Sequence, residues 1–183
     1  MRRPVTTQAL AAAAAVALTL AACGGDDAAG GDEAGDTSTG TDAETTTTED
    51  PREALEAEIV AAYEASWTDF IRAGDPPKPD APFLGDHLAG DALTISRNLL
   101  HEAEAEGVVV RGTYEFDARV TELADDRAVV EDCGFDQMEV VNPGSGEVVE
   151  RHDRERDGVV AELTREGSTW KVIKYTNDDQ VCG

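Results

Sequence analysis

The spacing of the apolar residues changes at Gly107, and this change limits the chain to a fold in which helices precede strands. From residue 50 to residue 106, apolar side chains recur every three or four positions, as on one face of a helix. From residue 108 to residue 121, apolar and polar residues alternate one by one, as on a half-buried strand. Helices followed by a run of strands predict an α+β fold with an antiparallel sheet.

The first predicted helix begins at Asp50 and ends near Gly74. Asp50 suits the N-cap, Pro51 suits the first helical position, and the prolines at 76 and 77 forbid continuation. A short helical turn is predicted at residues 83–88 and a longer helix at residues 91–106, which Gly107 closes.

Four strand regions are predicted after Gly107, at residues 108–121, 127–141, 147–165 and 169–175. Turn-forming residues separate them, most clearly Asn142-Pro143-Gly144-Ser145-Gly146 and Glu166-Gly167-Ser168. Gly112 interrupts the first strand and indicates a bend or bulge there. The pattern predicts a four-stranded antiparallel meander.

The N-terminus carries an export signal. Two arginines at positions 2 and 3 precede an apolar run at residues 9–22, which is shorter than the roughly 20 residues of a membrane-spanning helix. The run ends in Leu20-Ala21-Ala22-Cys23, which resembles a bacterial lipoprotein lipobox. The resemblance implies that residues 1–22 are a signal peptide cleaved before Cys23, whose sulfur then carries a diacylglyceryl anchor. The alternative is an ordinary secretory signal with Cys23 left for a disulfide.

Residues 23–49 are predicted to be the lipidated cysteine and a disordered acidic spacer. Beyond Cys23 the segment contains no Lys, Arg, aromatic or long aliphatic residue, so it cannot bury enough surface to offset the entropy of ordering it. The folded domain is therefore predicted at residues 50–183. The whole chain carries 39 acids against 15 bases and a formal charge of −24, which argues against nucleic acid as a partner.

The order of elements resembles the nuclear transport factor 2-like, or SnoaL-like, α+β cone. The region from residue 51 to residue 182 resembles more closely a group of lipoproteins from high-GC Gram-positive bacteria. The matching segments are Ala62-Tyr63 with Trp67, Gly90-Asp91-Ala92-Leu93, residues 107–112, residues 130–133 and Trp170-Lys171-Val172. The resemblance implies a cone-like fold, in which N-terminal helices pack on a curved four-stranded antiparallel sheet with a cavity between them. It implies no particular activity.

The three cysteines divide into one anchor and one pair. If Cys23 is lipidated, Cys133 and Cys182 remain in an exported and therefore oxidising compartment. We predict that these two form a disulfide that fastens the C-terminal tail to the second strand.

The predicted cavity is lined by aromatic residues and one carboxylate: Tyr63, Trp67, Phe70, Tyr114, Phe116, Asp132 and Trp170. Asp132 points inward if Ala128 and Val130 do, because side chains alternate along a strand. In an apolar cavity its pKa would be raised, so it could act as general acid or base, with Tyr114 as hydrogen-bonding partner. The alternative, which we favour, is a structural Asp132 paired with an Arg or with backbone N–H groups near the disulfide. The aromatic stripe is likewise more typical of a core.

No metal or cofactor is predicted, because His87, His101 and His152 are scattered and no phosphate-binding loop or nucleophile motif is present. We favour a non-enzymatic binding or accessory module of the cell envelope, held on the extracytoplasmic face of the membrane by the lipid on Cys23. Its partner would be a small apolar ligand or an envelope protein. The alternative is a cone-fold enzyme of isomerase or dehydratase type that uses Asp132 on a small hydrophobic substrate.

We expect the Cys23→Ser variant to leave the membrane fraction or to remain unprocessed, because serine offers no thiol for the lipid. Membrane fractionation and the electrophoretic mobility of the protein check this. A variant that fractionates and migrates like the wild type would contradict the lipoprotein prediction.

Overall fold

The computed structural model describes residues 50–151 and 156–183. The predicted signal peptide at residues 1–22, the lipidation site Cys23, the spacer up to residue 49 and His152 lie outside the described residues. The structure therefore bears on the predicted folded domain.

Three helices come first in the part of the chain that the structure describes, as predicted. Helix α1 spans Pro51–Gly74, and the carboxylate of its N-cap Asp50 accepts a 2.9 Å hydrogen bond from the Arg52 N–H. The short helix α2 spans Leu84–His87, and α3 spans Gly90–Glu106. Gly107 ends α3 in the left-handed conformation, with φ of 70°, which glycine adopts without steric cost.

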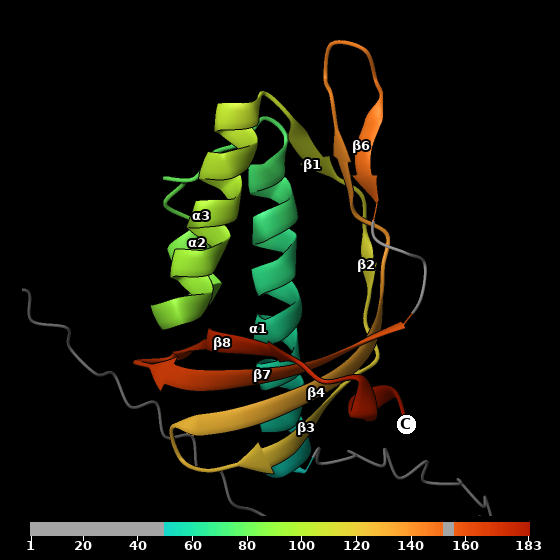
Figure 1. The fold of residues 1–183 in the computed structure, drawn as a ribbon. Helices are drawn as coiled ribbons and strands as arrows, with labels where there is room; N and C mark the ends of the chain where they lie inside the picture. The colour runs from blue at the N-terminus through green and yellow to red at the C-terminus, as the bar shows by residue number, and fades with distance from the viewer. Residues whose placement is uncertain (1–49, 152–155) are drawn as a thin grey trace, which may run out of the picture. The chain divides into compact units, whose positions relative to one another are not determined.

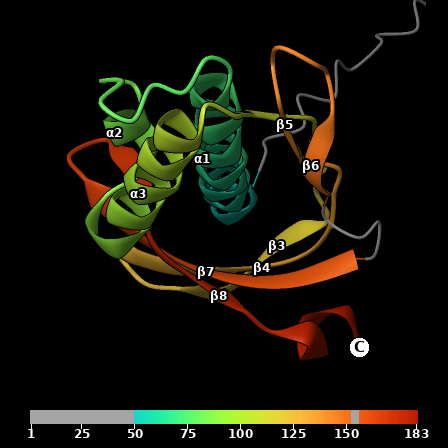
Figure 2. The same cartoon turned by 45° about the horizontal axis from the view of Figure 1, so that its top comes forward.

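The main sheet has five antiparallel strands rather than four. They are β2 (Tyr114–Glu115), β3 (Ala118–Leu123), β4 (Arg127–Asp136), β7 (Arg156–Glu166) and β8 (Thr169–Asn177). The order is β2-β4-β7-β8, and β3 also pairs with β4, next to β2 along the same edge. The helices gather on one face of this curved sheet, as Figures 1 and 2 show.

A separate three-stranded sheet extends beyond the main one, with the order β1 (Val109–Arg111), β5 (Glu139–Val141) and β6 (Val148–Arg151). The predicted four-stranded meander is therefore corrected to two sheets. The physical reason lies at Gly112, whose φ of 128° bends the predicted first strand and separates β1 from β2. A side chain at Gly112 would collide with the backbone of Gln137, so the two bent strands cross closely there.

The burial of the side chains follows the alternation of apolar and polar residues from which the first strand was predicted. Between residues 110 and 121 the apolar positions are buried or half-buried, whereas the polar residues between them are exposed. The core lies between the helices and the sheet, and its largest members come from both layers. They are Ile59, Tyr63, Leu84, Leu88, Leu100, Val130, Leu163, Trp170 and Val172.

The predicted disulfide between Cys133 and Cys182 is present, with 5.1 Å between the two Cα atoms and a sequence separation of 49. It holds the short 3₁₀ helix Asp179–Cys182 against the sheet. Gly158 on β7 has no room for a side chain because the Asp178 carbonyl lies against its Cα. The tail therefore packs directly on the backbone of β7.

We expect reduction of the disulfide to lower the free energy of unfolding by about 4 kcal/mol, because the bridge closes a loop of roughly 50 residues in the unfolded chain. Urea unfolding with and without a reductant measures the difference. The double variant Cys133→Ser and Cys182→Ser is the control, since its midpoint should not respond to the reductant. Equal midpoints for oxidised and reduced wild type would contradict the stabilising role.

Candidate functional site

Asp132 is the carboxylate that the sequence predicted to face the interior of the cone. It lies in the middle of β4 and its side chain is fully buried. Ala128 and Val130, four and two residues earlier, are buried on the same face, as the alternation of a strand requires. The predicted inward orientation of Asp132 therefore agrees with the structure.

Both oxygens of the Asp132 carboxylate accept a hydrogen bond. The Tyr63 hydroxyl donates to Oδ2 at 2.9 Å, and the backbone N–H of Asp117 donates to Oδ1 at 2.7 Å. Tyr63 comes from the buried face of α1, whereas Asp117 lies in the link between β2 and β3. The pairing of Ala118 with Asp132 in the β3–β4 ladder brings that link to the carboxylate.

Burial dominates the electrostatics of this group. Removal from water raises the pKa of Asp132 above its ordinary value, although the hydrogen bonds from the Asp117 N–H and from Tyr63 oppose the rise. The pKa of Tyr63 is also raised, first by burial and then by the nearby charge of Asp132. Tyr63 is thus held as a neutral hydroxyl donor beside a carboxylate that burial disfavours as an anion.

Aromatic rings surround Asp132 and fill the concave side of the sheet. Trp67 stacks on Tyr114 with 4.7 Å between ring centroids and 14° between planes. Tyr63 and Tyr114 both contact Phe116, at 5.9 and 4.9 Å between centroids. Tyr175 of β8 closes the group, 5.4 Å from the Trp67 ring. The rings occupy the space in which the sequence predicted a cavity.

Tyr114 lies close enough to Asp132 for each side chain to affect the pKa of the other, but its hydroxyl does not meet the geometry of the predicted hydrogen bond. Its hydroxyl is buried and has no hydrogen-bond partner within the described residues, as is also true of the Trp67 indole N–H. The hydroxyl lies against Gly134 of β4, where any side chain would overlap it. Burial and the charge of Asp132 raise the pKa of Tyr114. Tyr63 donates the hydrogen bond that the geometry shows.

Instead of the cavity predicted around Asp132, the structure has a small groove at the edge of the aromatic cluster. The groove has a volume of about 240 Å³ and is lined by Thr68, Ile71, Gly112, Thr113, Tyr114 and Phe116. We call it the Tyr114 groove. Tyr63, Asp132 and Trp170, predicted to line the cavity, are instead enclosed in the core, because the aromatic side chains pack against one another. Trp67 and Phe70 are half-buried and pack against the core.

Sequence reasoning missed the polar residues on the buried face of α1. Ser66 is fully buried, and its hydroxyl lies 2.6 Å from that of Tyr175. Asp69 is also buried, and its carboxylate is 2.9 Å from Nδ1 of His87. The signal was available, since both residues fall among apolar positions at helical spacing. The partners could not be predicted, because they lie on other elements.

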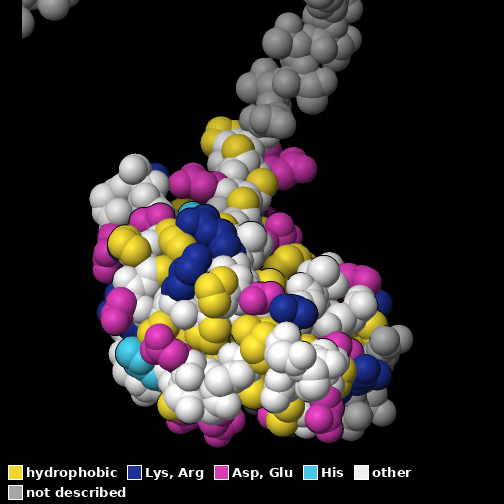
Figure 3. Space-filling view, turned by 90° about the horizontal axis from the view of Figure 1, so that it is seen from above, with side chains coloured by type: hydrophobic (Ala, Val, Ile, Leu, Met, Phe, Trp, Pro, Cys, Tyr) yellow, Lys and Arg dark blue, Asp and Glu magenta, His cyan; other side chains and the backbone are white. Residues whose placement is uncertain are grey.

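Exposed apolar side chains do not gather into a second site on the face drawn in Figure 3. Apolar, acidic and basic side chains are interspersed there. The large apolar residues exposed in the described part of the chain are Ile95, Leu99, Val148 and Val149.

Within the described residues, no cluster of three His, Cys, Asp or Glu side chains could hold a metal ion. None of the described helices is both long and apolar enough to cross a membrane.

Comparison with known proteins identifies the fold but no family. No protein-family model and no curated protein matches the chain. The intermembrane space region of the chloroplast protein ARC6 is similar in structure, with a TM-score of 0.51 and 20% identity over 70% of this chain and 95% of that one. A structure of Aln2 from a Streptomyces species has a TM-score of 0.45 and 15% identity, covering 73% of this chain and 95% of that one. The likeness to ARC6 supports the α+β architecture alone.

The raised pKa of Asp132 predicts a pH dependence of stability. A folded-state pKa above the unfolded value means that the native state holds the proton more tightly. The resulting stabilisation is complete below the unfolded pKa of about 3.9 and is lost as pH rises through the folded pKa. The free energy of unfolding of the wild type should therefore fall, relative to Asp132→Asn, as pH rises from about 3.5 to about 7, a range that spans the unfolded pKa.

Denaturant unfolding of both proteins across this range measures the difference. The Asp132→Asn variant supplies the matched background, because every other titrating group is unchanged. A difference that stays constant, or that changes in the opposite direction, would show that Asp132 is not strongly desolvated.

Proposed function

We propose that the protein is an exported lipoprotein, anchored by the lipid on Cys23 to the extracytoplasmic face of the membrane, whose domain is a non-enzymatic binding module of the cell envelope. We further propose that the domain belongs to the nuclear transport factor 2-like group. Helices that precede a curved antiparallel sheet and pack on its one face support that assignment. The lipobox-like segment Leu20-Ala21-Ala22-Cys23 supports the anchor.

The enclosure of Asp132 is the observation that carries the binding role. A general acid or base must come within hydrogen-bonding distance of the substrate atom whose proton it moves. Asp132 has no exposed surface. Both of its oxygens are already engaged by Tyr63 and by the Asp117 N–H. Asp132 lines neither the Tyr114 groove nor the pocket beside α2.

The Tyr114 groove is the place where a small apolar ligand would bind in this proposal. Its walls combine the side chain of Ile71 and the rings of Tyr114 and Phe116 with the small residues Gly112 and Thr113. Such a mixture of apolar walls and few polar groups is typical of ligand sites. The groove is small, so it suits one ring or a short aliphatic group rather than a large molecule.

A cone-fold enzyme remains the second candidate, because two buried donors among the aromatic rings lack hydrogen-bond partners. These are the Tyr114 hydroxyl and the Trp67 indole N–H, unsatisfied within the described residues. A substrate oxygen that reached them would also come near Asp132. In this hypothesis the substrate enters from the Tyr114 groove, so the ring of Tyr114 or of Phe116 must move aside to let it reach the carboxylate.

We expect the groove to bind toluene, a neutral apolar compound of one ring, and Thr68→Phe to weaken binding by about tenfold or more, because the added ring fills the groove. Isothermal titration of the full chain measures the affinity. Thr121→Phe is the matched control, since Thr121 is exposed on β3 and is not part of the groove.

Asp132→Asn separates the two candidates in the same titration. If the domain is a binding module with a sealed carboxylate, the Asp132→Asn variant should bind toluene as the wild type does. Equal binding by Thr68→Phe and wild type would contradict the groove as the binding site. A large effect of Asp132→Asn on binding would contradict the sealed interior and favour the enzyme.

A further inference from the structure

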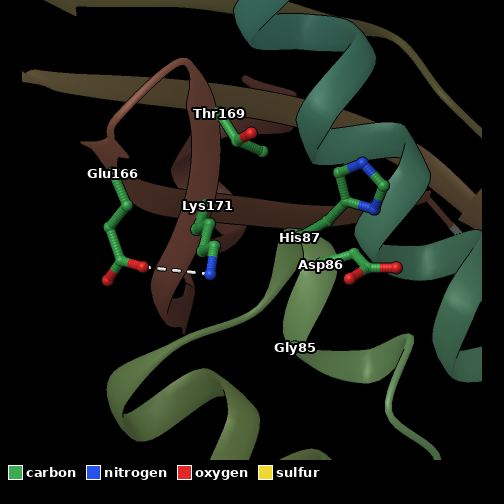
Figure 4. A pocket seen from close by; sticks show the side chains of 6 residues that line it. All are labelled: Gly85, Asp86, His87, Glu166, Thr169 and Lys171. Atoms are coloured by element: carbon green, nitrogen blue, oxygen red, sulfur yellow. Dashed lines mark ion pairs between the residues drawn. The ribbon is translucent and has the colours of Figure 1, made fainter. Parts of the chain in front are cut away.

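A second hollow lies between α2 and the β7–β8 hairpin, apart from the Tyr114 groove. Its volume is about 460 Å³ and it is lined by Gly85, Asp86, His87, Glu166, Thr169 and Lys171. It shares no residue with the Tyr114 groove. Figure 4 shows Asp86 and His87 on the α2 side, and Glu166 and Lys171 on the side of the hairpin. We call it the α2 hollow.

The ring of His87 is oriented by a buried carboxylate. Its Nδ1 lies 2.9 Å from Oδ2 of Asp69, whose side chain is only 10% exposed. A carboxylate accepts hydrogen bonds, so Nδ1 is the donor in this pair. Nε2 makes no hydrogen bond or ion pair with the described residues. His87 thus presents an oriented ring nitrogen without a partner beside the hollow.

The opposite wall offers donors. Lys171 is 20% exposed and its ammonium lies 3.0 Å from the Glu166 carboxylate. One ion pair uses one of the three N–H donors of an ammonium, so two remain for another group. Thr169 adds a hydroxyl to the same wall. Across the hollow, the carboxylate of Asp86 makes no hydrogen bond or ion pair with the described residues.

Neither close packing nor backbone conformation requires a glycine at position 85, but the absence of a side chain there leaves the hollow open. A side chain at this position would begin in open space, with no other atom within 4 Å, and the backbone of Gly85 does not have a positive φ. Glycine is a poor helix residue, so its presence in α2 favours neither the helix nor the packing. What it provides is space beside Asp86 and His87.

We propose that the α2 hollow binds a small zwitterion of the size of an amino acid. Its ammonium is recognised by the Asp86 carboxylate, and its carboxylate by Lys171 and Thr169. A simple anion is disfavoured because the chain carries a formal charge of −24. A simple cation leaves the Lys171 ammonium facing a like charge. This site goes beyond the apolar binding role proposed for the Tyr114 groove and does not depend on it.

Isothermal titration of the full chain with the free amino acid glycine tests the proposal. We expect saturable binding, and binding weaker by about tenfold or more for N-acetylglycine, which lacks the ammonium, and for glycinamide, which lacks the carboxylate. The variants Asp86→Asn and Lys171→Met should each weaken binding of the amino acid to a similar extent. Asp125→Asn, at an exposed turn outside the hollow, should bind as the wild type does.

The Gly85→Leu variant distinguishes binding inside the hollow from nonspecific attraction to the surface charges around it. It leaves every charge in place but fills the hollow, so binding should be lost while the melting temperature stays at or above that of the wild type. Absence of saturable binding to the wild type would overturn the proposal. So would equal affinity for N-acetylglycine or for glycinamide, or unchanged affinity in Gly85→Leu.

Discussion

The buried carboxylate of Asp132 is the group around which both layers of this domain are arranged. A charge that is removed from water is costly unless hydrogen bonds compensate it. Here one bond comes from Tyr63 on α1 and the other from the backbone of Asp117 between β2 and β3. The carboxylate therefore ties the first helix and the edge of the sheet to the central strand β4, and a shift of either layer would leave it without a donor.

The aromatic packing follows from the same arrangement. Tyr63 must cross the concave side of the sheet to reach Asp132, and the rings of Trp67, Tyr114 and Phe116 fill the space around it. Gly134, two residues after Asp132 on β4, leaves room for the Tyr114 hydroxyl. On the other face, Cys133 fastens the C-terminal tail to the same strand. One short segment of β4 thus organises the interior and anchors the end of the chain.

Local features of the fold were predictable because they depend on near neighbours in the sequence. The cap at Asp50, the end of α3 at Gly107 and the alternation after Gly107 all follow from local geometry. The bend at Gly112 was predicted, but the split into two sheets was not, since it depends on the pairing of β1 with β5, about 30 residues later in the chain. The inward side chain of Asp132 followed from alternation, whereas its donor, 69 residues away on α1, is fixed only by tertiary packing. The filling of the cavity depends on side-chain volumes in three dimensions, which periodicity does not report.

The central claim is that Asp132 is sealed from solvent and held by Tyr63. Nuclear magnetic resonance of the full chain tests it directly, by following the side-chain carboxyl carbon of Asp132 with pH and the exchange of the Tyr63 hydroxyl proton with water. We expect a pKa of Asp132 above the ordinary aspartate value and a hydroxyl proton that exchanges slowly enough to be observed. An ordinary or lowered pKa of Asp132, together with a Tyr63 hydroxyl proton in rapid exchange, would contradict the claim.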